Sequence, residues 1–321
     1  MLRITLVVCA LLTLTVWKET AADPAAPPKV TTLAGPAPSS SAELATRLAA
    51  ATSLNPQKTV LLDKPNGRLY LQTSVALREG LLEMFLCKKQ TKEHESVLMI
   101  DSSAQVIHAG LLAAGATPGR PARFQPTFSP PQGDQIEVWV HWQDEAGKPQ
   151  RATAQSWVRS LTRRYFAEKI GPLPAGVVIP KDSELRYDPM QQELIWFGIM
   201  TPEQEQELAA LTKDEAFRKA LHKFQRDSQP KGMSADFIFA GSSFVKNPDG
   251  QEWYAAEAGN LICVANFADA IIDVNVRSSD VNADASFEPN TPAVPPLRTP
   301  VVVELIPVKG SYKPAAEPAT R

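Results

Sequence analysis

Twenty-eight prolines among 321 residues constrain the fold of this chain more than any other feature. Proline lacks the amide donor that a β-ladder needs and interrupts helices, so it is confined to strand edges, turns and loops. The apolar runs between the prolines are short, and several of them alternate between apolar and polar residues. The sequence therefore predicts short strands joined by rigid loops.

The predicted fold class is α+β and mostly β, with an antiparallel or mixed sheet. With 44% hydrophobic residues, the chain is able to bury a substantial core. Two helices are expected late in the chain. The first begins at Thr201-Pro202-Glu203, which combines a capping threonine with a proline in the first turn, and the second spans 214–224. We interpret them as a helical insertion at about 201–228. Strands are expected on both sides, at TVLLD, RLYLQTSVAL, residues 136–142, DFIFAGS, EWYAAE, LICVAN, AIIDVNV and TPVVVELIPV.

The N-terminus has the composition of a signal peptide. Arg3 precedes the apolar run from Ile4 to Trp17, and Thr20-Ala21-Ala22 offers small residues for cleavage after Ala22. The run has fourteen residues, fewer than the ~20 that a helix needs to cross a bilayer. The sequence therefore predicts a cleaved signal peptide at 1–22, an exported protein in the periplasm or on the cell surface, and no membrane span in the mature chain.

The remaining organisation follows from composition. Residues 23–57 are rich in Pro and Ala and are expected to form a leader, residues 58–308 the folded domain, and residues 309–321 a disordered tail. A formal net charge of -2 implies no basic surface, so composition does not support binding to nucleic acid. His141, on a predicted strand, and His222, on a charged helix, are interpreted as a packing residue and a solvated residue.

The stretch from Glu83 to Gly119 concentrates the residue types that carry chemistry. Residues 81–87 and 95–100 are interpreted as two strands of a hairpin, with the polar run 88–93 as its turn. In an antiparallel hairpin of this length, Cys87 lies opposite His94, and Phe85 opposite Ser96. A helix is predicted next, because Ser102 and Ser103 offer N-cap oxygens, apolar residues recur at helical spacing, and Gly115 ends the segment.

Cys87 and Cys263 are the cysteines that remain after removal of the signal peptide. In an oxidising compartment, a pair of cysteines more often forms a disulfide than a catalytic site. A disulfide that closes so long a loop would contribute about 3 to 5 kcal/mol in the chain-entropy model. A Cys87–Cys263 disulfide is therefore one prediction for this pair.

A second prediction places a metal in this stretch. Cys87, His94, Glu95 and His108 supply sulfur, nitrogen and oxygen ligands that a divalent metal such as zinc or copper accepts. Their spacing matches no standard metal motif. Alternatively, Cys87 and His94 form a reactive pair, because an imidazolium beside a thiol lowers the pKa of the thiol. A structural role accounts for the same residues, with His108 as a core histidine and Glu93 and Glu95 as charges that protect a hairpin edge.

The same residues carry a resemblance to a known family. Three parts of this stretch resemble the YdjY-type domain of exported bacterial proteins: Cys87, the run Thr91-Lys92-Glu93-His94-Glu95-Ser96 and the segment 106–115. Residues 239–242 and 259–267 resemble its C-terminal portion, so the resemblance covers about 58–307, with the helical stretch as an insertion. Some relatives carry a ferredoxin-like label, but an iron–sulfur cluster needs about four thiolates, and two cysteines do not provide them. The resemblance implies a family and no reaction.

Two functions from different classes stay open. The first is a non-catalytic exported domain that binds an unknown protein or a small-molecule ligand through its β scaffold. The second is a metal- or thiol-dependent enzyme centred on Cys87, His94, Glu95 and His108. The sequence does not decide between them, and it names no metal, ligand or partner.

Overall fold

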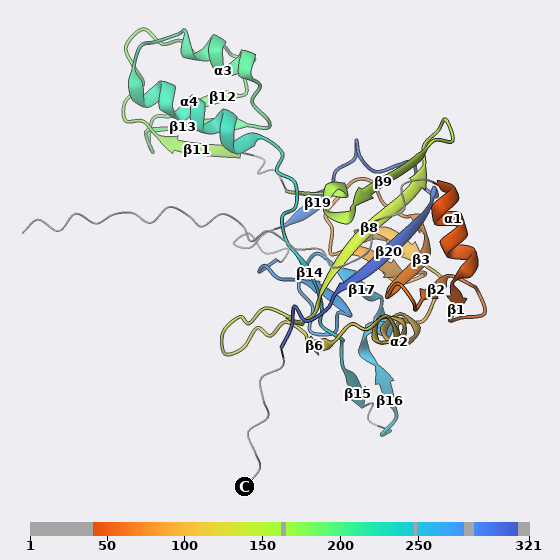
Figure 1. Cartoon of the computed structure of the whole chain (residues 1–321). Helices are drawn as coiled ribbons and strands as arrows, with labels where there is room; N and C mark the ends of the chain where they lie inside the picture. Colours follow the sequence, from red (N-terminus) through yellow and green to blue (C-terminus); the bar gives the residue numbers. More distant parts are fainter. Residues whose placement is uncertain (1–40, 162–164, 247–248, 279–285, 314–321) are drawn as a thin grey trace, which may run out of the picture. The chain divides into compact units, whose positions relative to one another are not determined.

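A computed structural model describes residues 41–161, 165–246, 249–278 and 286–313 (Figure 1). The predicted signal peptide, the first part of the predicted leader and most of the predicted tail lie outside the described residues. In the described part of the leader, a short helix, α1 (Ser41–Ala50), precedes the first strands.

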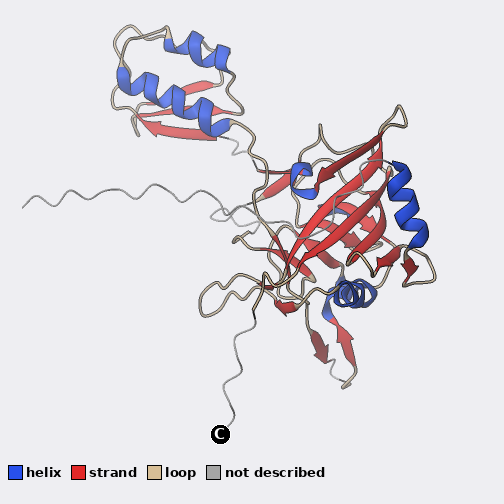
Figure 2. Cartoon of the chain, viewed as in Figure 1, coloured by secondary structure: helices blue, strands red, loops and turns tan. Residues whose placement is uncertain are grey.

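Eight strands close into a barrel, whose strands are red in Figure 2. Around the ring the order is β3, β20, β8, β14, β18, β17, β4 and β5, and the pairing of β5 with β3 closes it. Six of these pairings are antiparallel, whereas β17–β18 and β4–β5 are parallel. The prediction of a mostly β fold with a mixed sheet is confirmed. The strands are β3 (Arg68–Val75), β4 (Met84–Lys88), β5 (Ser96–Ile100), β8 (Gln135–Gln143), β14 (Phe237–Phe239), β17 (Asn260–Cys263), β18 (Ile272–Val274) and β20 (Pro300–Val308).

Other strands extend or decorate the barrel. β2 (Val60–Asp63) pairs with β3 and carries β1 (Thr52–Ser53), and β9 (Pro149–Thr153) pairs with β8. Three two-stranded pairs complete the barrel region: β6 (Pro118–Arg120) with β7 (Gln132–Gly133), β10 (Val158–Ser160) with β19 (Phe287–Pro289), and β15 (Phe244–Lys246) with β16 (Glu252–Tyr254). Three 3-10 turns lie at Glu93–Glu95, Ala154–Trp157 and Ala255–Ala258.

The helix predicted after Ser103 is present as α2 (Ala104–Ala114). The Ser103 hydroxyl accepts a hydrogen bond from the Val106 amide, and Gly115 ends the helix with φ of 95°. A residue with a side chain is strained at this φ, which explains the glycine. The buried face of α2 joins the same apolar core as the barrel interior, so the helix packs on the barrel.

The predicted hairpin between residues 81 and 100 is wrong. β4 and β5 are parallel, and Cys87 is paired in register with Met99, while Ser96 is paired with Met84. The polar run that resembles a turn is instead a connection that returns along the barrel. Glu93 holds it in place by accepting hydrogen bonds from the backbone amides of Gln90 and Thr91.

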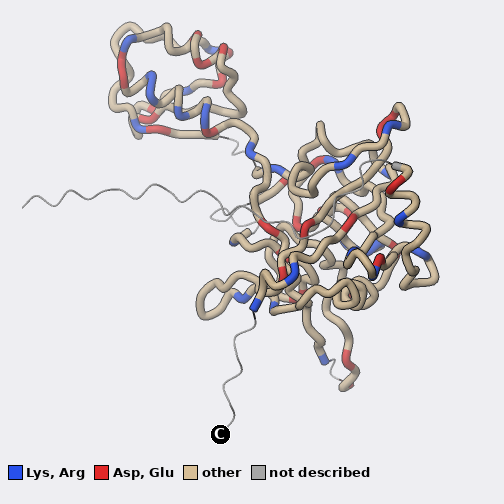
Figure 3. Tube along the Cα trace, in the orientation of Figure 1, with Lys and Arg blue, Asp and Glu red and all other residues tan. Residues whose placement is uncertain are grey.

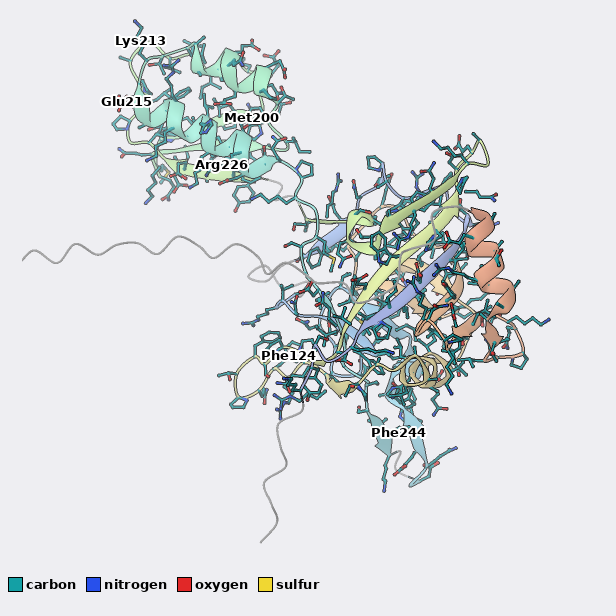
Figure 4. All side chains as sticks on the ribbon, in the orientation of Figure 1. Phe124, Met200, Lys213, Glu215, Arg226 and Phe244 are labelled. Carbon is teal, nitrogen blue, oxygen red and sulfur yellow. The ribbon has the colours of Figure 1, made fainter. Side chains whose placement is uncertain are left out.

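Residues 165–229 form a module with a hydrophobic core of its own. A three-stranded sheet of β11 (Tyr165–Lys169), β13 (Glu193–Phe197) and β12 (Leu185–Asp188) packs against α3 (Pro202–Ala209) and α4 (Glu215–Ser228). Thr201 caps α3 as predicted, in a reciprocal capping box with Gln204. The predicted helical insertion is therefore the second half of a larger α/β module, in which Met200 is buried and Lys213 and Glu215 are exposed (Figure 4).

Acidic and basic residues are interspersed along the chain, in agreement with the near-neutral composition (Figure 3). Within the described ranges, none of the helices combines the length and the apolar character needed to span a membrane.

Candidate functional site

A groove of about 630 Å³ lies on the outer face of the barrel. Its floor crosses five strands in the order β5, β3, β20, β8 and β9, and α1 forms a wall. One row of side chains crosses this floor, because each residue pairs with the next on the neighbouring strand. The row consists of Gln72, Val302, His141 and Arg151. The wall is apolar and consists of Leu44, Ala45 and Leu48. The groove therefore combines an apolar side with a polar floor.

A fully buried carboxylate, Glu304, lies beside this row. Its neighbours Val303 and Leu305 point into the barrel core, so Glu304 points to the outer face. The Glu304 carboxylate pairs with the guanidinium of Arg68, which is also buried, and accepts a hydrogen bond of 2.9 Å from His141 Nε2. Arg151 Nη2 lies 3.6 Å from Glu304 Oε2. Three cationic or ionisable groups therefore surround one buried acid.

The charges in this cluster shift the pKa of its members. Burial disfavours the ionised form of Glu304, but the hydrogen bond from His141 and the charge of Arg68 outweigh burial, so the pKa of Glu304 is lowered. Burial, followed by the charge of Glu304, raises the pKa of Tyr70 to about 12. The cluster thus contains an ionised glutamate and a neutral tyrosine at neutral pH.

Arg151 also contacts an aromatic ring. Its guanidinium carbon lies 3.5 Å from the centroid of the Trp139 ring, which is a cation–π contact. Trp139 is held in turn by a hydrogen bond of 3.2 Å from its Nε1 to Glu137. The planar guanidinium is therefore fixed on the floor of the groove.

The sequence analysis assigned His141 a packing role and did not consider Arg151, Arg68 or Glu304. One signal was present in the sequence: Glu304 is a charged residue within the apolar strand VVVELIPV. A charge in the middle of such a strand is buried only with a partner. Its hydrogen-bonded partners His141 and Arg68 lie 163 and 236 positions away in the sequence, so the charged residue in the strand marks Glu304 and does not identify its partners.

The two cysteines lie in a second cluster on adjacent strands. Cys87 and Cys263 are fully buried with Met84 and Ala270, and the Cys263 thiol contacts Met84 Sδ at 3.4 Å. Both thiols are free in the structure, so the predicted disulfide is not shown. Burial raises the pKa of both thiols, which favours the unreactive protonated form.

The predicted metal ligands are not brought together. His94 is 77% exposed, and its Nε2 lies 3.8 Å from Glu95 Oε2. His108 packs against the Phe239 and Tyr254 rings, and its Nδ1 bonds the Tyr254 hydroxyl at 2.7 Å. Burial lowers the pKa of His108 and favours its neutral form. In the part of the chain that the structure describes, no three His, Cys, Asp or Glu side chains are placed to hold a metal ion.

A buried aspartate lies near Cys263. Asp273 accepts hydrogen bonds from the amides of Val274, at 2.7 Å, and Phe267, at 3.4 Å, and from Asn266 Nδ2 at 3.1 Å. Burial outweighs these three donors and raises the pKa of Asp273 to about 7. This carboxyl group therefore titrates near neutral pH.

The fold and the groove define a closed β-barrel protein with an open hollow on its outer face. Residues 60–167 match the family model of the YdjY domain, so the chain contains a YdjY domain, in agreement with the resemblance seen in the sequence. The match runs from β2 to β11 and ends before β14. Comparisons with the curated proteins and with the solved structures found no match.

Removal of the buried acid is expected to destabilise the barrel. Glu304→Ala leaves Arg68 buried without its carboxylate, so we expect the free energy of unfolding in urea to fall by about 3 to 5 kcal/mol. The control is Glu288→Ala, which removes the partly exposed pair between Arg159 and Glu288 and should cost at most about 1 kcal/mol. Equal losses in the two variants would contradict the role given to the buried cluster.

Asp273 is expected to make stability depend on pH. Its folded-state pKa lies near 7, above its unfolded value, so the folded state binds more protons between about pH 4 and pH 7. The contribution of Asp273 to stability should therefore be fully present below about pH 4 and should decrease by roughly 4 kcal/mol as the pH rises through 7. In Asp273→Asn this decrease should disappear, whereas the exposed control Asp249→Asn should keep it. Chemical denaturation at several pH values measures the slope, and an unchanged slope in Asp273→Asn would mean that the three donors keep the carboxylate ionised.

Proposed function

We propose that the chain is an exported, non-catalytic binding protein whose binding site is the groove between α1 and the barrel. The observation that carries the proposal is the groove itself. Its volume of about 630 Å³ lies within the roughly 300 to 1,000 Å³ of small-molecule sites. An apolar wall and a few fixed polar groups on the floor are the features that bind a ligand and orient it.

The positions of the reactive residues favour binding over catalysis. A thiol enzyme needs an accessible thiolate beside a base, whereas both thiols are fully buried in an apolar cluster and their pKa is raised. A metal enzyme built on His94 and His108 needs these side chains at one point, but His108 is engaged with Tyr254 and His94 is turned to solvent. The second hypothesis, a metal- or thiol-dependent enzyme, therefore has the weaker support.

We also infer that the folded domain extends beyond the matched residues, from about 58 to 308. Four of the eight barrel strands, β14, β17, β18 and β20, follow residue 167, and β20 pairs with both β3 and β8. A domain that ended at residue 167 would lack β20 between β3 and β8, and β14, β18 and β17 between β8 and β4, so the ring would be open in two places. The α/β module at 165–229 would then be an insertion within the domain.

The export proposal predicts a defined mature chain. When the full-length protein is produced in a bacterial host, we expect the intact mass of the extracytoplasmic product to correspond to a chain that begins at Asp23. Alkylation of the denatured protein without reductant should add two groups if the thiols are free, as the structure has them. A full-length chain confined to the cytoplasm would contradict export.

The binding proposal predicts a saturable site for a neutral apolar probe. The fluorescent amine N-phenylnaphthylamine should bind the native protein, and Ala45→Trp, which fills the groove from α1, should abolish the fluorescence increase. The matched control is Ala49→Trp, because Ala49 is exposed on the same helix and does not line the groove. No binding to the native protein, or equal binding to the two variants, would refute the assignment of the groove.

A further inference from the structure

Arg151 has hydrogen-bond donors that the described residues leave unused. Its Nε is buried and has no partner, and the Glu304 oxygen at 3.6 Å from Nη2 is beyond hydrogen-bond distance. Five N–H donors in a planar fork match the geometry of a carboxylate or a phosphate. The side chain is 22% exposed, stacks on Trp139 and lines the groove, so its guanidinium is held in place where a ligand can reach its exposed part.

The charges around the groove favour an anion at this point. The Arg68 guanidinium pairs with the Glu304 carboxylate. On the far side of the floor, Lys89 and Asp101 carry opposite charges and both line the groove. Glu137 lies on the same strand face as Trp139 and accepts the hydrogen bond of its Nε1, but Glu137 does not line the groove. Glu304, whose Oε2 lies 3.6 Å from Arg151 Nη2, also pairs with Arg68, so it offsets the positive charge of Arg151 only in part.

The rest of the groove is suited to an apolar body. Leu44 and Leu48 of α1 line it together with Met99 and Pro300. A second hollow of about 520 Å³ shares Trp142 and three other residues with the groove and continues along the proline-rich segment 292–296. An elongated apolar group that starts at Arg151 would therefore have apolar surface along its length, either beside α1 or along the segment 292–296.

We propose that the groove binds a small amphipathic anion, with its carboxylate or phosphate group on Arg151 and its apolar chain along α1; this rests on the proposed function of the groove. The anion and the guanidinium form a bidentate, charge-assisted pair in a half-buried position, where such pairs are stronger than at the surface. The apolar chain supplies affinity by burial and the anionic group supplies orientation.

Three probes with the same ten-carbon chain test the proposal on the full native protein by calorimetry. Decanoate and decyl phosphate carry an anionic group, and decanol is the neutral control. We expect at least one of the two anions to bind about tenfold more tightly than decanol, because a hydrogen bond to a charged group is worth more than one to a hydroxyl. The stronger of the two anions identifies carboxylate or phosphate as the natural head group.

Variants then locate the anionic group. Arg151→Gln should reduce the affinity for the preferred anion about tenfold, to that of decanol, and leave the affinity for decanol unchanged. Arg151→Lys keeps the charge next to Glu304 and thus the fold, but it loses the planar fork, so it should lose most of the preference. Arg218→Gln, an exposed arginine on α4, is the control and should bind as the native protein does.

The outcomes separate this inference from the function on which it rests. If decanol binds as tightly as both anions, or if both Arg151 variants keep the preference for the anion, the inference is overturned while the groove remains a binding site. If none of the three probes binds and N-phenylnaphthylamine does not bind either, both proposals fail. If Arg151→Gln does not fold, the comparison of the native protein with Arg151→Lys still decides.

Discussion

Closure of the barrel is the constraint on which the rest of this structure depends. β5 pairs with β3 through Ser74 with Met99 and Val75 with Leu98, and this short contact turns an open sheet into a ring. Around a closed ring of strands, the number of antiparallel neighbours must be even, because each one reverses the chain direction. With β17–β18 parallel and the other six pairings antiparallel, β4 and β5 must be parallel as well. A hairpin at this position would be incompatible with the ring.

The same closure creates the groove. It places Met99 of β5 beside β3, so that the outer face continues without an edge from β5 to β9. A curved sheet face with a helix against it leaves a hollow, and α1 provides that helix. The buried cluster around Glu304 makes this face polar. Replacement of such a cluster by apolar residues is often neutral or stabilising, so its stability contribution alone does not explain it. Fixing Arg151 on the floor is a role that apolar residues would not fill.

The accuracy of the sequence analysis depended on how local each signal was. The helix after Ser103 was predicted because its cap, its apolar period and its terminal glycine all lie within thirteen residues. The polar run 88–93 was wrongly interpreted as a hairpin turn, because six polar residues suit a hairpin turn as well as a connection between two parallel strands. His141 was assigned to packing because its partner, Glu304, is 163 residues away. Strands β11 and β12 of the α/β module were not predicted, because they have only five and four residues, whereas its capped helices were predicted.

The sequence by itself determined the class of fold, the match to the YdjY domain and the local elements. Prolines limit strand length, caps and glycines set the ends of α2 and α3, and the run around His94 carries the resemblance that the match over 60–167 confirms. The direction of β5, the burial of both cysteines and the meeting of Arg151 with Glu304 were decided only by tertiary structure. These features depend on contacts between residues far apart in the chain, and no local pattern of charge, hydrophobicity or turn residues encodes which distant strand will become a neighbour.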